Sequence, residues 1–418
     1  MTRGLAKTWD CVPLRDICEQ INYGYTASAK QEPIGPKFLR ITDIVDELIN
    51  WESVPYCTIS EKEFAKYELQ RGDIVIARTG ATSGYAKMIK KHPKAVFASY
   101  LVRLRIKEEH DWRYVGLIAE SDDFKRYIKS VIGGAAQPQA NAQVLTSFLI
   151  PLPPLPIQRK IAAILSAYDD LIENNTRRIR ILEEMAQFIY REWFINFRFP
   201  DHETIRMVDS KLGKIPEGWE IGKLKDIVKE VKQSTYPGEH LSNRRYVPID
   251  CISKKSIALI DSRPWQEAQS SLFLFSKDDI LFGAMRPYFH KVAVAPYDGV
   301  TRSTCLVLRP VDDSIYGYAV YLLFQDATVG YATAHSQGTT IPYTAWNGSL
   351  EDMDIVIPDK ILLKRFNAIV SANLALVHNL VAKNGVLRQS RDLLLPHLIS
   401  DELDVSELDI DTNDSGGK

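Results

Sequence analysis

The residues best suited to chemistry in this 418-residue chain are hydrogen-bond donors on loops of small residues. The stretch "ARTGATSGYAK" at 77–87 combines basic, hydroxyl and glycine residues, and "KMIKKHPK" at 87–94 adds a basic run. The stretch "GGAAQPQAN" at 133–141 offers amide side chains, which can hold adenine through two hydrogen bonds. Because small residues let backbone N–H groups approach phosphates, these loops suit contact with a nucleic acid.

Similar polar loops recur at matching places in the second half, over 286–302 and in "QGTTIPYTAWN" at 337–347. For any single residue a solvated loop or a local turn is the alternative, so the argument depends on the recurrence. The two sets also differ in their residues, as two units that read different sequences would. The candidate DNA contacts are Arg40, Arg78, Thr79, Ser83, Tyr85, Lys87, Lys90, Lys91, Gln137, Gln139, Asn141, Arg286, Tyr288, His290, Lys291, Arg302, Thr339, Thr340, Tyr343 and Asn347.

Patterns typical of catalytic or metal sites do not appear in the sequence. The stretch "GATSGYAK" at 80–87 has the wrong spacing for a P-loop, and no G-x-G-x-x-G motif opens a helix. The eight histidines form no HExxH or HxH pattern, and the five cysteines form no CxxC pair. We therefore expect no catalytic residue, no metal site and reduced thiols.

The charge distribution is compatible with DNA binding but does not require it. The net charge is −1, yet residues 401–418 hold seven acidic residues and one basic residue. Without this segment the chain has 51 basic and 46 acidic residues, a net charge of +5. No apolar run approaches the roughly 20 residues of a membrane helix, and the N-terminus lacks the apolar core of a signal peptide. A cytoplasmic protein without membrane contact is expected.

Four segments of the first half recur in the same order in the second, at shifts between 204 and 210 residues, which indicates a duplication. "LQRGDIVIART" at 69–79 echoes "FSKDDILFGAM" at 275–285, and Pro153 matches Pro358. Each copy begins with about 150 residues of short β-like runs and loops and continues into a helical pattern. The two parts meet in "GGAAQPQANAQVLTSFLIPLPPLPIQRKIAAIL" at 133–165. This stretch shows a polar loop, an apolar strand, prolines and a helical pattern more clearly than its copy at 337–370.

The helical segments carry narrow apolar seams at heptad spacing. Such a helix cannot bury itself, so we expect the two to pair antiparallel, the alternative being that each packs on its own domain. The first helix should extend to about residue 196, roughly 60 Å at 1.5 Å per residue. The residues expected at subunit interfaces on these helices are Gln158, Ile161, Leu165, Ile172, Ile179, Phe366, Val370, Val377 and Leu380.

Four junction segments resemble the specificity subunits of type I restriction-modification systems. They are the 133–165 stretch, "KLGKIPEGWEIGKLKDI" at 211–227, "REWFINFRFP" at 191–200 and "LLLPHLISDELDV" at 393–405. The resemblance implies an α/β (α+β) fold with two target-recognition domains separated by two long helices that form an antiparallel coiled coil. The implied parts are a first recognition domain at 1–155, a first spacer helix at 156–200, a linker at 201–216, a second recognition domain at 217–358, a second spacer helix at 359–400 and an acidic disordered tail at 401–418.

The resemblance also implies a non-catalytic role in a larger complex. Each recognition domain would read one half of a bipartite target in double-stranded DNA. The chain would hold two modification subunits, adenine methyltransferases that bind S-adenosylmethionine, and the complex would recruit restriction subunits that use ATP and Mg. Where the family commonly has Glu-Gln after the prolines, this chain has Ile157-Gln158 in the first copy and Leu362-Leu363 in the second.

Two other classes of protein remain open from the sequence. A self-sufficient DNA methyltransferase or nuclease with unrecognised motifs would bind S-adenosylmethionine or cleave DNA as a purified chain. A structural coiled-coil protein would not shift DNA in a salt-dependent way.

Overall fold

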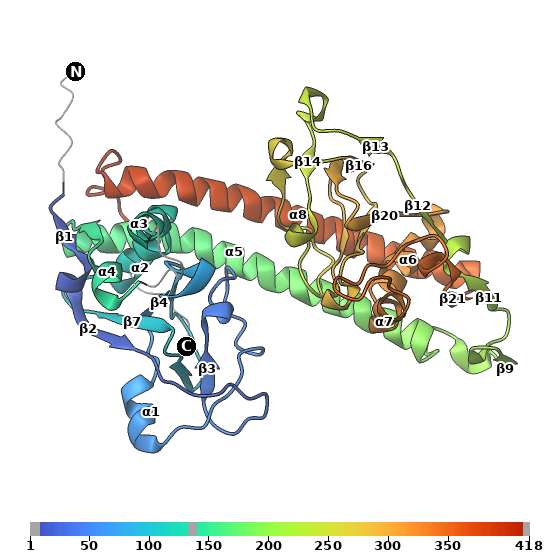
Figure 1. The fold of residues 1–418 in the computed structure, drawn as a ribbon, viewed down its shortest axis with the longest axis horizontal. Helices are drawn as coiled ribbons and strands as arrows, with labels where there is room; N and C mark the ends of the chain where they lie inside the picture. The colour runs from blue at the N-terminus through green and yellow to red at the C-terminus, as the bar shows by residue number, and fades with distance from the viewer. Residues whose placement is uncertain (1–8, 133–139, 413–418) are drawn as a thin grey trace. The chain divides into compact units, whose positions relative to one another are not determined.

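The computed structural model describes residues 9–132 and 140–412. The chain divides into two compact units. Unit 1 comprises residues 1–173 and 387–418, and unit 2 comprises residues 174–386. Figure 1 shows the ribbon of both units and labels many of their elements.

Unit 1 is built around a four-stranded antiparallel sheet in the order β2-β7-β4-β5. Beside it, β3 and β6 pair in parallel and β1 pairs with β8 antiparallel. The strands are β1 Cys11–Pro13, β2 Cys18–Tyr23, β3 Lys37–Leu39, β4 Ile74–Ala77, β5 Ala86–Met88, β6 Ala95–Phe97, β7 Leu101–Ile106 and β8 Leu149–Pro151. The short helices are α1 Glu61–Tyr67, α2 Trp112–Glu120, α3 Asp122–Ile132 and α4 Ala142–Thr146.

The central strand β4 is buried on both faces, as its uninterrupted apolar sequence IVIA predicts. Ile74 and Ile76 join the hydrophobic cluster formed with α2, α3 and the start of the first long helix. Val75 and Ala77 point the other way, into the cluster that contains Leu39. The strand therefore holds the loop that begins at residue 78 on a rigid base.

Unit 2 repeats this plan. Its four-stranded antiparallel sheet has the order β12-β20-β17-β18, β14 and β19 pair in parallel, and β11 pairs with β21. The strands are β9 Met207–Ser210, β10 Gly213–Pro216, β11 Glu220–Lys223, β12 Val228–Glu230, β13 Ser234–Thr235, β14 Arg245–Tyr246, β15 Arg263–Pro264, β16 Leu272–Phe275, β17 Ile280–Gly283, β18 Val292–Val294, β19 Gly299–Thr301, β20 Cys305–Pro310 and β21 Asp354–Ile357. The short helices are α6 Tyr316–Leu323 and α7 Asp326–Ala334.

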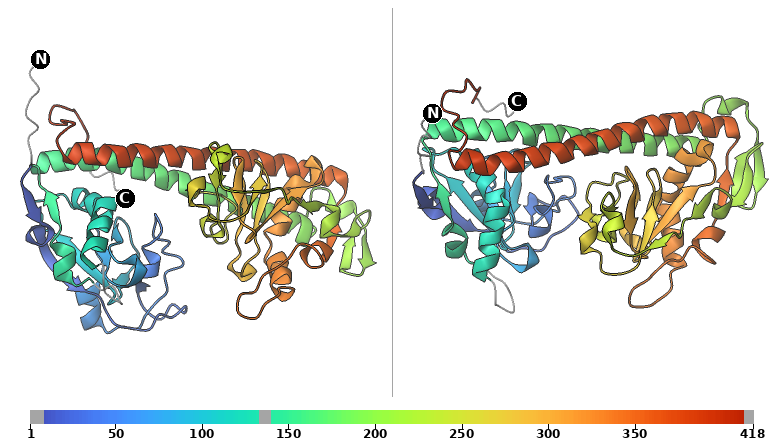
Figure 2. Two further views of the ribbon diagram at one scale, coloured as in Figure 1. Left: turned by 45° about the horizontal axis from the view of Figure 1, so that its top comes forward. Right: turned by 90° about the horizontal axis from the view of Figure 1, so that it is seen from above.

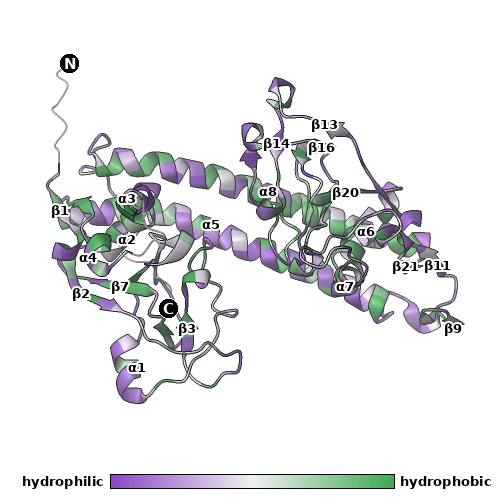
Figure 3. Cartoon of the chain, in the orientation of Figure 1, coloured by the Kyte–Doolittle hydropathy of each residue, from purple (hydrophilic) through white to green (hydrophobic). Residues whose placement is uncertain are grey.

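Two long helices run through the chain, α5 Leu155–Tyr190 and α8 Lys360–Ile399. A π-helical turn at Arg191–Ile195 extends α5, so the expected end near 196 agrees with the structure. Hydrophilic and hydrophobic residues alternate along both helices (Figure 3), because one side of each is buried.

The two helices pack antiparallel within each unit (Figure 2). In unit 1 the Asp169 carboxylate accepts a hydrogen bond from Arg391 at 2.7 Å. In unit 2 the Asn175 amide donates to Asn384 at 2.9 Å, and the rings of Tyr190 and Phe366 lie 6.0 Å apart between centroids. As the residue number rises on α5 it falls on α8, which is the direction that the seams predict.

Two segments differ in character from the sequence expectation. Residues 201–216, expected as a linker, contain the antiparallel hairpin of β9 and β10. The described part of the expected disordered tail, 401–412, has neither helix nor strand but packs on unit 1. Val405 is only 4% exposed there, and Ser406 accepts a hydrogen bond from Lys160 on α5. An apolar side chain inside an acidic segment can anchor it, which overall charge does not reveal.

Candidate nucleic-acid interface

Backbone hydrogen bonds fix the loop that follows β4 in unit 1. The Arg78 N–H donates to the Tyr100 carbonyl at 3.1 Å, and the Arg78 carbonyl accepts from the Ala140 N–H at 2.9 Å. The loop after β4, the start of β7 and the segment before α4 are thereby joined at one residue. This junction brings two of the sequence-predicted loops together.

Unit 2 has the same arrangement at equivalent positions. The Ala284 N–H donates to the Thr304 carbonyl at 2.9 Å, and the Ala284 carbonyl accepts from the Thr344 N–H at 2.9 Å. In the same loop, the Arg286 N–H donates to Pro342 at 2.7 Å. The backbone scaffold is therefore duplicated, while the side chain at its centre changes from arginine to alanine.

One aromatic ring packs against Arg78 in unit 1, and the backbone of a second tyrosine, Tyr100, bonds to it. Its guanidinium carbon lies 5.0 Å from the ring centroid of Tyr23, and its Nε donates to the Ser99 carbonyl at 3.1 Å. Tyr23 is 45% exposed and Tyr100 is 56% exposed. The Tyr23 hydroxyl also accepts from the Ala142 N–H at 2.9 Å. Sequence reasoning missed both tyrosines, because neither belongs to a polar loop.

Helix α3 places a basic edge next to the same loop. A surface hollow is lined by Tyr85, Asp122, Lys125, Arg126 and Lys129. The Lys125 ammonium lies 5.3 Å from the Tyr85 ring centroid, and Lys125 and Arg126 also pair with Asp122 and Asp123 of the same helix. The equivalent helix α7, with the sequence DATVGYATA, has no basic residue. These cations were also missed, since their relation to the loop depends on how α3 packs.

Several predicted contacts lie where they can meet a ligand. Arg78, Thr79 and Tyr85 are partly exposed in unit 1, and Lys91 is exposed. In unit 2 the exposed or partly exposed candidates are Arg286, Tyr288, Arg302, Thr339, Thr340, Tyr343 and Asn347. Burial raises the pKa of Tyr343, whose hydroxyl donates to the Ser303 carbonyl at 3.1 Å. Gln137 and Gln139 lie outside the described residues.

Two predicted contacts of unit 1, Ser83 and Lys87, are engaged within the protein instead. Ser83 is 2% exposed and donates to the Gly80 carbonyl. The Lys87 ammonium donates to the Glu47 carbonyl at 3.0 Å and pairs with Glu120 at 3.5 Å. A contact of either side chain with DNA would have to replace these interactions.

Lys90, Arg40 and Asn141 also have partners within the protein. Lys90 pairs with Asp169 and Asp170 of α5, at 3.6 and 3.9 Å. The Arg40 guanidinium binds both carboxylate oxygens of Asp43, at 2.8 and 3.0 Å. The Asn141 side-chain oxygen accepts from the Val144 N–H at 2.8 Å and caps α4.

In unit 2, His290 and Lys291 likewise have partners within the protein. His290 is 5% exposed, with one ring nitrogen 3.0 Å from an Asp326 oxygen and the other 2.9 Å from the Phe324 carbonyl. The Lys291 ammonium donates to the Ile249 carbonyl at 2.8 Å, and burial lowers its pKa. The partners come from distant segments, so the sequence could not reveal them.

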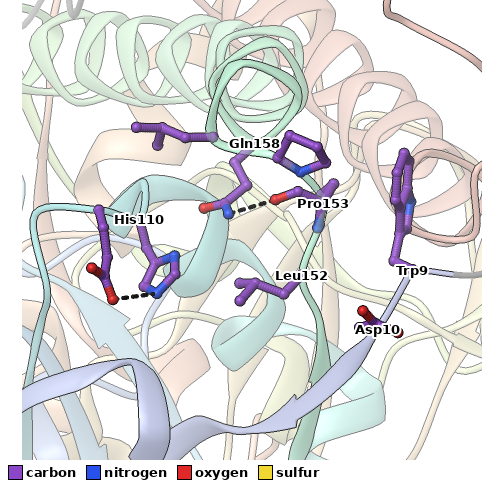
Figure 4. Close-up of a pocket in the computed structure, with 9 residues that line it drawn as sticks. Trp9, Asp10, His110, Leu152, Pro153 and Gln158 are labelled. Atoms are coloured by element: carbon purple, nitrogen blue, oxygen red, sulfur yellow. Dashed lines mark hydrogen bonds and ion pairs between the residues drawn. The ribbon is translucent and has the colours of Figure 1, made fainter.

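The predicted subunit-interface residues are all buried inside the chain, with exposures of 0–5%. They are Gln158, Ile161, Leu165, Ile172, Ile179, Phe366, Val370, Val377 and Leu380. Gln158 braces the junction of unit 1 with α5: its amide donates to Pro153 at 2.8 Å, and its oxygen accepts from the Asp111 N–H at 3.0 Å. Figure 4 shows Gln158 beside the hollow lined by Trp9, His110 and Leu152. These side chains hold the chain together and offer no surface to a partner.

A second set of apolar residues on the long helices is exposed. Leu171, Ile181 and Phe188 of α5 are 52%, 44% and 61% exposed. At a constant shift of 205 residues, Leu376, Val386 and Leu393 of α8 are 38%, 64% and 60% exposed. The shift equals that between Pro153 and Pro358, so this stripe could have been found by aligning the two helices.

Metal and membrane sites were searched over the described residues. Within 9–132 and 140–412, no group of three or more His, Cys, Asp or Glu side chains could hold a metal ion. None of the helices in this part of the chain is both long and apolar enough to cross a membrane.

Comparison with known proteins gives similarity along nearly the whole chain. Residues 6–184 match the family model described as type I restriction modification DNA specificity domain. The MjaIX type I restriction enzyme specificity subunit of Methanocaldococcus jannaschii is 27% identical, over 97% of this chain and 95% of that protein. The putative MjaX specificity subunit of the same organism is 29% identical over 53% of this chain and 52% of that protein.

A solved structure shares the fold. The type I restriction-modification S subunit from M. genitalium superposes with a TM-score of 0.56 at 14% identity, covering 95% of this chain and 98% of that chain. At this identity the likeness concerns the fold alone, and it spans both units.

Proposed function

The chain belongs to the family of type I restriction-modification specificity subunits, and from this premise we propose that it reads a bipartite target in double-stranded DNA, one half-site with each unit. The observation that carries the proposal is the duplicated loop scaffold centred on Arg78 and Ala284. An identical backbone arrangement with different side chains suits two readers of two sequences. Contacts to base edges in the major groove would supply the sequence specificity. Contacts to phosphates would fix the position of the protein along the duplex.

We assign no catalytic step to this chain. Its role is to bring DNA to modification subunits, which bind S-adenosylmethionine and methylate adenine, and to restriction subunits, which use ATP and Mg. The residues at the two loops are hydrogen-bond donors, aromatic rings and cations, which bind and orient DNA. The proposed compartment is the cytoplasm, where the genome and these partners meet.

The exposed stripe supports the docking of two modification subunits. Ile181 and Phe188 on α5 correspond to Val386 and Leu393 on α8 at a shift of 205 residues. Exposed apolar side chains at helical spacing suit packing against a partner helix. Because the same pattern occurs twice, two copies of one partner can each meet an equivalent surface.

The test is a map of methylated adenines in a host that lacks adenine methylation. The chain is co-expressed with the modification subunit of its own system, and methylated positions are located in the host genome. The proposal predicts a single split motif with two defined half-sites separated by a fixed gap. A continuous motif, or binding of S-adenosylmethionine by the purified chain alone, would contradict the assignment.

A further inference from the structure

Arg78 is the most firmly positioned cation on either loop scaffold. Its backbone N–H and carbonyl are both hydrogen-bonded, to Tyr100 and Ala140, so the residue cannot move without breaking the junction. The strand that precedes it, β4, is buried throughout. The Cα position is therefore set by the core of unit 1 and not by a mobile loop.

The side chain is held as well. The guanidinium lies over the Tyr23 ring at 5.0 Å, and Nε donates to the Ser99 carbonyl at 3.1 Å. Tyr23 is itself fixed by the bond from the Ala142 N–H to its hydroxyl. Among the described residues, the two terminal nitrogens of Arg78 have no hydrogen-bond partner. A rigid pair of N–H donors is thus left available beside the ring of Tyr23, which is 45% exposed.

Guanine is the base that this fork fits. In the major groove it presents the N7 and O6 acceptors side by side, and an arginine that donates to both is the commonest base-specific contact. Preorganisation by an aromatic ring lowers the entropy lost on binding. Phosphate is the other bidentate acceptor in DNA. A contact to phosphate would, however, serve both units, whereas the equivalent position in unit 2 is Ala284.

We infer that Arg78 reads a guanine in the half-site bound by unit 1. The inference rests on the proposed function, since it assigns one base of the proposed target. The half-site bound by unit 2 has no counterpart of this contact, so the two halves of the target differ in how they are recognised.

The experiment compares the methylation motif of the wild-type complex with that of Arg78→Lys. Lysine retains the charge and a phosphate contact but loses the planar fork. The wild-type motif should contain a G·C pair in the half-site bound by unit 1. The Arg78→Lys motif should accept other base pairs at that position, and the half-site bound by unit 2 should be the same in both. Discrimination at that position should fall roughly tenfold to a hundredfold. Arg71→Lys is the matched control, because Arg71 also lies over an aromatic ring, Trp112 at 5.9 Å, but before β4.

Several outcomes overturn the inference. The motif could remain unchanged in Arg78→Lys, or the relaxed position could be an A·T pair. If the variant complex fails to methylate, competition with duplexes that each carry one base change measures its selectivity directly. Equal selectivity at every position in variant and wild type, with weaker overall binding, identifies a phosphate contact instead. Failure of the proposed function is distinguishable, because the wild-type complex would then give no split motif.

Discussion

The guanidinium of Arg105 binds both carboxylate oxygens of Asp73, at 2.9 and 3.0 Å. Asp73 immediately precedes β4 and Arg105 lies in β7, so the pair ties together the two strands that carry the Arg78 junction. Arg309 and Asp279 form the same pair in unit 2, at 2.6 and 2.8 Å. An ion pair retained in both copies marks a structural requirement of the scaffold.

Asp73→Asn should destabilise unit 1 by about 3 kcal/mol, since removal of one partner leaves a buried charge uncompensated. Asp73 is 1% exposed, and it also lies 3.8 Å from Arg103, whose side chain is 3% exposed. Asp279→Asn is the matched comparison and should cost less, about 1–2 kcal/mol, because Arg309 is 41% exposed and water screens it. Urea unfolding of the full chain measures both. Equal losses, or a larger loss for Asp279→Asn, would contradict the account.

Glu183 predicts a specific dependence of stability on pH. It lies on α5 in unit 2, and one carboxylate oxygen accepts from the Ser256 hydroxyl and from the N–H groups of Ile257 and Ala258, at 2.8, 2.8 and 2.9 Å. Burial raises the pKa of this carboxyl above its ordinary value of 4.5. The folded state therefore binds the proton more tightly than the unfolded state, and stability falls as pH rises from about 4.5 through the raised pKa.

Glu183→Gln keeps one oxygen for all three hydrogen bonds and removes the titration. The melting temperature of Glu183→Gln minus that of the wild type should increase as pH rises from about 4.5 to about 7. Glu184→Gln, on the exposed side of the same turn, is the control. It keeps the buried Glu183 carboxyl, so its melting temperature should still fall relative to that of Glu183→Gln over this range. A constant difference between Glu183→Gln and wild type across this range would show that burial does not perturb the carboxyl.

The sequence predicted the duplication and the main strands because these depend on local pattern. The run "GDIVIAR" contains β4, and "AVFASYLVRLRI" contains β6 and β7. The direction of helix pairing also followed from the seams. The register of the two helices, in which Asn175 pairs with Asn384, did not follow from the seams. One helix alone does not specify where its partner meets it.

The candidate site was predicted less well, for a related reason. A lysine on a loop looks the same whether its partner is solvent or a carboxylate from a distant helix, as with Lys90 and Asp169. Conversely, Tyr23 and Lys125 join the site only through the packing of β2 and α3. Loop composition predicts a region of each unit, but it does not predict which side chains of that region face outward.

The basic edge of α3 should contribute to DNA affinity without contributing to specificity. Changing Lys125, Arg126 and Lys129 to glutamine should weaken binding of all sequences alike. The slope of log affinity against log salt should become shallower by about 0.9 for each phosphate that is no longer neutralised by a cation. The measurement is a salt titration of DNA binding by the assembled complex.

The control for this change is the removal of three exposed lysines elsewhere. Lys211, Lys214 and Lys225 lie at the hairpin and the 224–226 turn of unit 2, and their replacement by glutamine should leave the slope nearly unchanged. If the α3 variant alters the methylated motif, its cations contact bases and the assignment to phosphate fails.

The repeated apolar stripe predicts the number of bound modification subunits. Phe188→Asp or Leu393→Asp alone should reduce the count from two to one, and the double variant should bind none. Both side chains are about 60% exposed, so the fold should tolerate the change. Native mass spectrometry of the reconstituted complex gives the count.

Ile361→Asp is the matched control for the docking variants. Ile361 is 74% exposed on α8, but its counterpart at the 205-residue shift is Pro156, so it lies outside the repeated pattern. Two subunits should remain bound. Retention of two subunits by the Phe188→Asp, Leu393→Asp double variant would place docking on another surface.

The central claim is that each unit reads its own half-site, and the most direct measurement changes one loop at a time. Methylated adenines are mapped for a unit 1 variant, Thr79→Ala with Arg78→Lys, and for a unit 2 variant, Thr339→Ala with Thr340→Ala. The account predicts that the motif changes in one half-site for the first variant and in the other half-site for the second, with the gap between them preserved. Changes confined to the same half-site in both variants, or altered spacing without altered bases, would contradict it.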